Sequence, residues 1–125
     1  MAYSETLKLV AGDTLPELTL TLKDSNTAAA GQTLDENDSA TWAPINLGGA
    51  TVRLRLREVG STTISSTLTC SLVGDGSAGQ VVTDFPTGTL ASEGTYEGEI
   101  EITHSGGGIQ TVYDLIKLKV RGDFD

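Results

Sequence analysis

The chain has 125 residues, a length that fits one domain with one hydrophobic core. Acidic residues outnumber basic ones by 17 to 8, and the formal net charge is -9 at pH 7. Nucleic acid and anionic membranes would repel such a surface, so neither is an expected partner. The single cysteine cannot form an internal disulfide, and no apolar stretch approaches the roughly 20 residues of a membrane helix. The first ten residues lack the apolar core of a signal peptide, so we expect synthesis in the cytoplasm.

The first third of the chain predicts two short strands followed by a long insertion. Residues 6–10 predict one strand, and a turn at Gly12-Asp13 separates it from the next. Over residues 18–23, leucines alternate with polar residues, which is the period of a strand with one buried face. Residues 24–44 break this pattern and are long for a hairpin loop. We expect them to form an exposed, mobile insertion that Trp42 docks onto the domain.

Two later segments carry rows of opposite charge. Residues 52–57 alternate apolar residues with arginines, and residues 96–102 alternate glutamates with apolar residues and a glycine. The arginine row is Arg53, Arg55 and Arg57, the glutamate row is Glu97, Glu99 and Glu101, and Lys117 and Lys119 follow near the end of the chain. In an immunoglobulin-like sandwich these segments would be adjacent strands. We expect a three-strand ladder with the glutamates in the middle; the alternative is three separately solvated rows.

Turn residues divide the rest of the chain into further short strands. Residues 64–72 and 80–83 predict two strands, separated by a turn at 74–76. A glycine hairpin at 106–108 leads to a last predicted strand over residues 109–120. About seven or eight antiparallel strands without a helix predict one all-β domain, an immunoglobulin-like β-sandwich over residues 1–125.

A sequence typical of a tyrosine corner agrees with this fold. Glu93-Gly94-Thr95-Tyr96 looks like the corner of immunoglobulin-like folds, in which a tyrosine hydroxyl bonds the nearby backbone. Gly98 stands where antibody domains have a cysteine, so the likeness is architectural and excludes an antibody-type disulfide.

The order of several motifs resembles a known family. Gly12-Asp13-Thr14 precedes Leu-Thr-Leu-Thr-Leu at 18–22 and Ile-Asn-Leu-Gly-Gly-Ala-Thr-Val at 45–52; Gly94-Thr95-Tyr96 and the segment 109–120 close the series. Outside residues 24–44, this order is similar to the N-terminal domain of phage baseplate upper proteins. The resemblance implies an immunoglobulin-like domain that joins tail or fibre components of a tailed-phage virion. Family members often continue into a helical linker and a receptor-binding head, whereas this sequence stops at Asp125. That difference favours connection, capping or decoration over receptor binding.

The candidate catalytic and ligand-binding residues do not match the pattern of a known catalytic, metal or phosphate site. His104 is the only histidine and is expected in an exposed turn, and Cys70 is expected to be buried among leucines. The acidic residues at 35–38 are candidates for calcium, but their spacing does not match an EF-hand loop, so a solvated loop is the default. Residues 106–108 lack the lysine and helix of a phosphate loop, and the tripeptide at 121–123 is attributed to chance. We therefore expect no enzyme activity, cofactor or metal.

The leading functional hypothesis is a structural protein of a virion, connecting tail, baseplate or fibre components in symmetric copies. A few apolar and aromatic anchors dominate such contacts. The expected anchors are Tyr3, Trp42, Phe85 and Phe124. Capsid decoration is the alternative, and copy number per particle separates the two. A carbohydrate- or receptor-binding module is a further alternative, ranked lower because aromatic residues make up only 5% of the chain.

Overall fold

The computed structural model describes residues 3–14, 17–86, 88–113 and 115–122, with side chains described from residue 6 onward. These residues form ten strands and one short 3-10 turn, which confirms the expected all-β class. The elements are β1 (Tyr3–Val10), β2 (Leu18–Thr21), β3 (Lys23–Ala28), η1 (Ser39–Thr41), β4 (Trp42–Pro44), β5 (Thr51–Glu58), β6 (Ser66–Leu72), β7 (Gln80–Thr83), β8 (Gly94–Thr103), β9 (Ile109–Thr111) and β10 (Leu115–Arg121).

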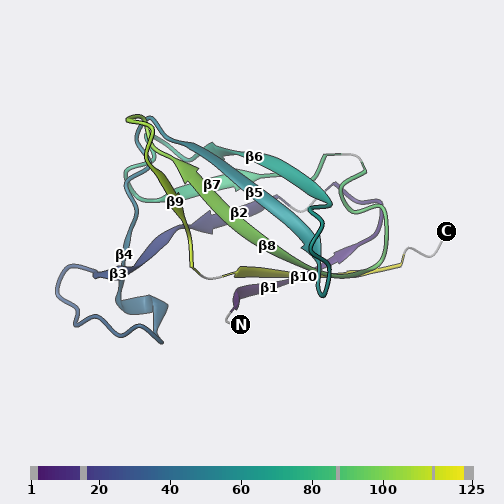
Figure 1. The fold of residues 1–125 in the computed structure, drawn as a ribbon, viewed down its shortest axis with the longest axis horizontal. Helices are drawn as coiled ribbons and strands as arrows, with labels where there is room; N and C mark the ends of the chain where they lie inside the picture. Colours follow the sequence, from purple (N-terminus) through teal and green to yellow (C-terminus); the bar gives the residue numbers. More distant parts are fainter. Residues whose placement is uncertain (1–2, 15–16, 87, 114, 123–125) are drawn as a thin grey trace.

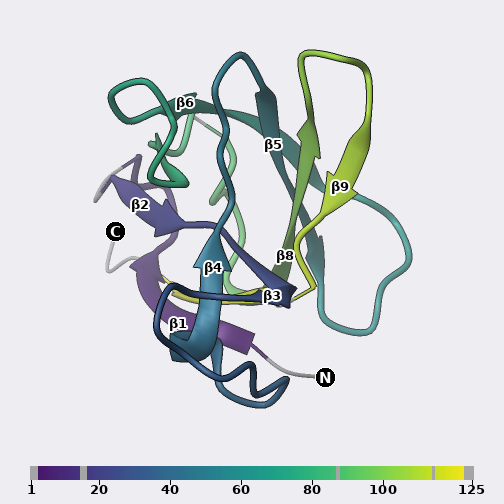
Figure 2. The same ribbon diagram turned by 90° about the vertical axis from the view of Figure 1, so that its left-hand side faces the viewer.

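Most of the strands belong to one mixed sheet that curls on itself (Figures 1 and 2). Along the sheet the order is β1-β10-β8-β5-β6-β7-β2, and β9 pairs with β8 beside this path. β1 and β10 run parallel, and the other pairs are antiparallel. Residues 66–70 of β6 pair with β5, whereas Ser71 and Leu72 pair with β7. Because β6 pairs with β5 on one side and with β7 on the other, the sheet is continuous. It forms a curled half-barrel of seven strands, and the expected separation into two layers is not clear.

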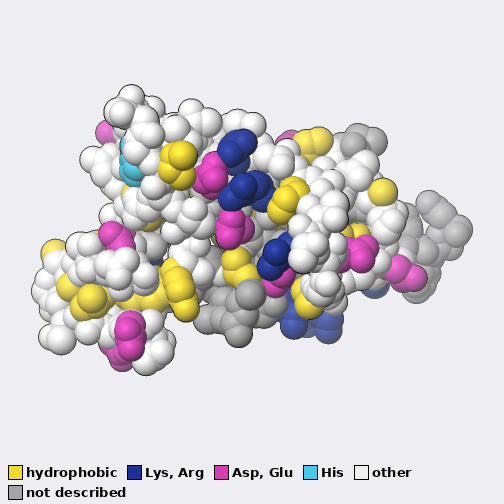
Figure 3. Space-filling model, viewed as in Figure 1, with side chains coloured by type: hydrophobic (Ala, Val, Ile, Leu, Met, Phe, Trp, Pro, Cys, Tyr) yellow, Lys and Arg dark blue, Asp and Glu magenta, His cyan; other side chains and the backbone are white. Residues whose placement is uncertain are grey.

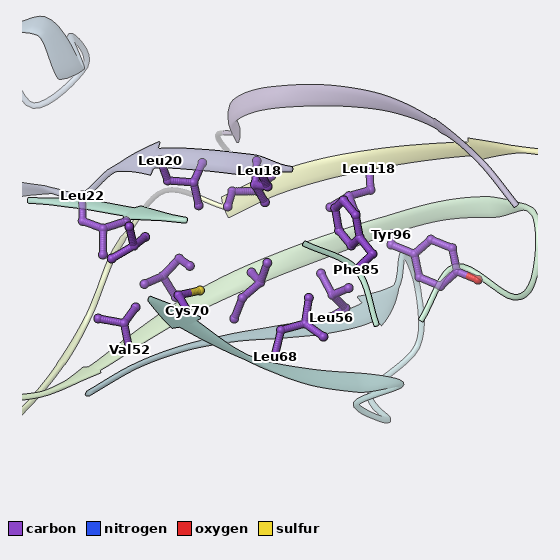
Figure 4. Packing of buried hydrophobic residues seen from close by; sticks show 14 of the residues in the cluster. Leu18, Leu20, Leu22, Val52, Leu56, Leu68, Cys70, Phe85, Tyr96 and Leu118 are labelled. Carbon is purple, nitrogen blue, oxygen red and sulfur yellow. The ribbon is translucent and has the colours of Figure 1, made fainter. Parts of the chain in front are cut away.

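The curled sheet encloses a core to which most strands contribute alternate side chains (Figure 4). In β5 the apolar residues face this core and the arginines face outward, as the alternation predicts. Phe85 and Leu90 enter the core from the segment between β7 and β8. The largest fully buried side chains are Phe85, Leu47, Leu54, Leu56, Leu90, Ile100, Ile102, Ile116, Leu118, Val52 and Val81.

The predicted last strand, 109–120, is divided in two. β9 and β10 both pair with β8, but the register changes between them: Thr111 lies opposite Glu101, whereas Ile116 lies opposite Gly98. The chain from Thr111 to Ile116 therefore advances five positions while β8 advances three, so two extra residues are accommodated here. The signal in the sequence is Leu115-Ile116: two consecutive buried residues cannot both lie on one face of a regular strand.

Residues 24–44 are more ordered than the predicted mobile insertion. β3 pairs with β4 in a separate two-stranded sheet, and η1 precedes β4. We call this segment the arm. Figure 1 shows that it projects from one end of the molecule, and its loop side chains are exposed as predicted. Side-chain bonds to the backbone stabilise it: Asp38 caps η1 by accepting from Ala40 N at 3.0 Å, and Trp42 Nε1 donates to Asp35 O at 2.9 Å.

The tyrosine corner is formed as predicted. The hydroxyl of Tyr96 donates to the backbone carbonyl of Ser92 at 3.0 Å. Burial, together with the negative charge of Glu58, raises the pKa of Tyr96, so its hydroxyl keeps the proton that it donates. The bond fixes the entry of the chain into β8, the strand that carries the glutamate row.

Candidate contact surfaces

The arginine and glutamate rows face each other across β5 and β8. Their register pairs Arg53 with Glu101, Arg55 with Glu99 and Arg57 with Glu97. We call these six residues the charge ladder; Figure 3 shows basic and acidic side chains alternating on this face. Arg55 Nη2 lies 2.7 Å from Glu99 Oε1 and 3.2 Å from Glu101 Oε2, Arg57 Nε lies 2.7 Å from Glu97 Oε1, and Arg53 bonds Glu101. A slip of one residue would turn the whole row into the core, so the ladder specifies the register.

Charge and burial differ from rung to rung. Glu97 is ionisable but only 7% exposed, whereas the side chain of its partner Arg57 is partly exposed. At the other end, the hydrogen bond from Arg53 holds the pKa of the Glu101 carboxyl below its ordinary value, reinforced by the charges of Arg53 and Arg55 and opposed by burial. Glu101 therefore stays ionised and keeps both arginines in place.

The lysines of β10 flank the glutamates only in part. Lys117 lies opposite Glu97 in the register, so the predicted order of arginine, glutamate and lysine strands holds at this rung. Lys119 lies opposite Thr95, and on its other side it neighbours Lys8 of β1. Its expected place beside the glutamate row was wrong, because the row begins at Glu97, two residues after Thr95.

The expected aromatic anchors are not surface residues where their side chains are described. Phe85 is 1% exposed and packs in the core, and Trp42 is 4% exposed between the arm and the main sheet. Neither can contact a partner directly, so their assignment as anchors was wrong; both serve packing instead. The backbone of Tyr3 belongs to β1, whereas its side chain and all of Phe124 lie outside the described residues.

The structure exposes two large side chains that sequence reasoning missed. Ile109 is 69% exposed and Tyr113 is 77% exposed, and they lie on β9 and in the two-residue insertion that follows it. Tyr113 also lines a groove of about 530 Å³ between this segment and the arm, which contributes Asn26 and Asn37. The insertion shifts the register, so Tyr113 falls on no regular strand face and no periodicity marks it.

The residues considered for chemistry make local contacts, and His104 is half-buried where an exposed turn residue was expected. His104 Nε2 lies 3.0 Å from Gln110 Oε1, across the glycine hairpin. Burial raises the pKa of the Cys70 thiol to about 11, which disfavours the thiolate that nucleophilic attack requires. Asp35 accepts a bond from Asn37 N at 2.9 Å, which is a local turn. Across the described ranges, no group of three or more His, Cys, Asp or Glu side chains is arranged to hold a metal ion.

The fold and surface define a class of protein, but comparisons add no family. Within the described part of the chain, no helix has the length and hydropathy to cross a membrane. The protein is thus an all-β domain with an ordered arm and an exposed tyrosine beside a groove. No protein-family model matches the sequence, and no curated protein matches it significantly.

Proposed function

We propose that the chain is a non-enzymatic structural protein of a tailed-phage virion, a connector of tail, baseplate or fibre components that acts through protein–protein contacts. The observation that carries this proposal is the exposure of Ile109 and Tyr113 beside the groove along the arm. Tyrosine is enriched in the cores of protein interfaces, where one large aromatic side chain can supply much of the binding energy. A partner that covers this segment would remove both side chains from water.

The strand arrangement supports the immunoglobulin-like part of the proposal. β8 lies between β5 and β10, which is the relation of the middle strand to its neighbours in the corresponding immunoglobulin sheet. The bond from Tyr96 to Ser92 has the geometry of a tyrosine corner at the start of that strand. The order of motifs that resembles phage baseplate upper proteins gives the further step from fold to virion assembly.

The state of the reactive side chains supports a role in contact over a role in catalysis. Cys70 is a buried thiol with a raised pKa, and His104 is paired with the neutral amide of Gln110. General acid–base or nucleophilic catalysis needs a positioned partner for such groups.

Incorporation into particles tests the proposal. Tyr113→Asp places a charge at the centre of the proposed contact and should reduce the amount of the chain in purified virions at least about tenfold, which is the effect of losing roughly 1.4 kcal/mol of binding energy. Val59→Asp, at an exposed apolar position after β5, is the matched control and should be incorporated normally. Equal thermal stability of the two variants would show that folding is not the cause.

Two outcomes would contradict the proposal. The chain could be absent from purified particles, or Tyr113→Asp could be incorporated as well as Val59→Asp. Copy number, from quantitative mass spectrometry of the wild-type particle, separates the locations: roughly tens of copies fit a tail or baseplate ring, whereas hundreds would fit capsid decoration.

A further inference from the structure

A second hollow lies on the outer face of the sheet, at the end opposite the arm. It has a volume of about 560 Å³ and extends over the ends of β1 and β10 and the start of β8. The register places Lys8 beside Lys119, and Lys119 beside Thr95, all on the outward face because their neighbours Leu9 and Val120 are buried. β8 begins here with Gly94 and Thr95, whose small side chains leave space above the sheet.

The lining of this hollow is apolar at its base and basic around its rim. Val10 and the aliphatic stems of the lysines supply apolar surface, while the ammonium groups of Lys8 and Lys119 remain at the surface. Arg121 adds a third cation, beside Val10 in the register, and Glu93 adds one carboxylate. Directly opposed like charges such as Lys8 and Lys119 are unfavourable, so an anionic occupant would relieve their repulsion.

The arm has the complementary composition. Residues 24–44 contain four acidic residues and no lysine or arginine. Near the tip, Leu34 is 39% exposed, and Asp35 and Glu36 follow it on the surface. The tip is also held in shape: Thr41 Oγ1 accepts from Asp35 N at 3.0 Å, and Asp35 O accepts from the indole of Trp42. The arm tip therefore presents an apolar side chain next to carboxylates, and the hollow has an apolar base with a basic rim. The two surfaces are complementary in both charge and polarity.

We propose that the protein associates head to tail, with the arm tip of one copy, residues 34–37, seated in the basic hollow of the next. Figure 1 shows the arm at one end of the molecule and the ends of β1 and β10 toward the other, so a chain cannot fill its own hollow. The contact joins two different surfaces, and repetition of such a contact gives a ring if the rotation closes and a filament if it does not. Electrostatic attraction between exposed groups makes the association sensitive to salt.

A charge-swap experiment tests the proposal on purified protein. The first variant, Lys8→Glu/Lys119→Glu, reverses the rim; the second, Glu36→Lys/Asn37→Lys, reverses the arm tip without touching the side chains that bond within the arm. By analytical ultracentrifugation, the wild type should associate at low salt, with a dissociation constant that rises at least about tenfold as screening increases. Each variant alone should be monomeric at concentrations where the wild type associates. The mixture of the two should associate again, because the unchanged acidic tip of the rim variant fits the unchanged hollow of the arm variant, and the basic tip of the arm variant faces an acidic rim.

A matched variant controls for net charge. Gln80→Lys/Asp84→Lys adds the same three positive charges as the arm variant, at exposed positions on and after β7. Alone it should still self-associate, because its arm tip and its hollow are both unchanged, and this result would show that the arm variant does not lose association through its net charge. The proposal is overturned if the wild type is monomeric at low salt and high concentration, if the arm variant self-associates as well as the control, or if the mixture of the rim and arm variants stays monomeric. The experiment needs no virion, so its result is independent of whether the protein belongs to a phage particle.

Discussion

The pair of Arg57 and Glu97 is the most enclosed rung of the charge ladder and allows a quantitative test. The side chains are 36% and 8% exposed, and Arg57 Nε lies 2.7 Å from Glu97 Oε1. Exposed ion pairs contribute about 0.2–1 kcal/mol, whereas removing one partner of a fully buried pair costs about 3–5 kcal/mol. This rung lies between the two limits, and Lys117 on the other side of Glu97 compensates part of any loss. We therefore expect a coupling free energy of about 1 kcal/mol between Arg57 and Glu97.

A double-mutant cycle measures this coupling. Urea unfolding of the wild type, Arg57→Gln, Glu97→Gln and the double variant gives the four free energies of unfolding, with an unchanged m-value as the check on the two-state analysis. Arg53 and Glu97 are the control pair, because they belong to opposite ends of the ladder, and their effects should add within about 0.5 kcal/mol. If the effects of Arg57→Gln and Glu97→Gln were also additive within that margin, the two side chains would not be coupled, and the charge ladder would not stabilise the register.

Three further predictions concern single positions. Tyr96→Phe removes the bond to Ser92 O and should lower the free energy of unfolding by about 1 kcal/mol in urea; no loss would show that the corner is not stabilising. Gly98→Ala would place a Cβ 2.8 Å from a leucine of β5 and should cost about 1–3 kcal/mol, whereas Gly108→Ala, with open space around it, should be near neutral; equal melting temperatures would contradict this packing. Cys70 should resist thiol reagents at pH 8 until the protein unfolds. Burial raises the pKa of the Cys70 thiol from 9.0 to about 11 in the folded protein, so the free energy of unfolding should decrease as the pH rises from 9 to 11. Rapid labelling of Cys70 in the folded protein would refute its burial.

Strands with strict alternation were predictable, together with their register. In β5 and β8 the apolar residues recur at every second position, and only one phase buries them while pairing arginines with glutamates. The tyrosine corner was also predictable, because Gly94-Thr95-Tyr96 is a local pattern whose bond forms within four residues. These features depend on local sequence and on the burial of one face.

The features that were missed depend on long-range geometry. β3 shows no alternation of apolar and polar residues, so the sequence does not mark it as a strand. It forms because its backbone pairs with β4, which carries the buried Trp42. The exposure of Tyr113 arises from two extra residues that shift the register between β9 and β10; the pair Leu115-Ile116 marks the break in the pattern, but it does not show which neighbouring side chain becomes exposed. Phe85 was expected to be an anchor, but the segment that carries it packs over the core and buries its side chain. The continuity of the sheet through β6 could not be read from strand lengths alone.

An electron cryomicroscopy map of the intact virion would show whether this protein works by contact within a particle. We predict density for the chain at a junction between components, with Tyr113 and the groove along the arm covered by a neighbouring protein. A particle that lacks the chain, or one in which this groove faces solvent in every copy, would contradict it.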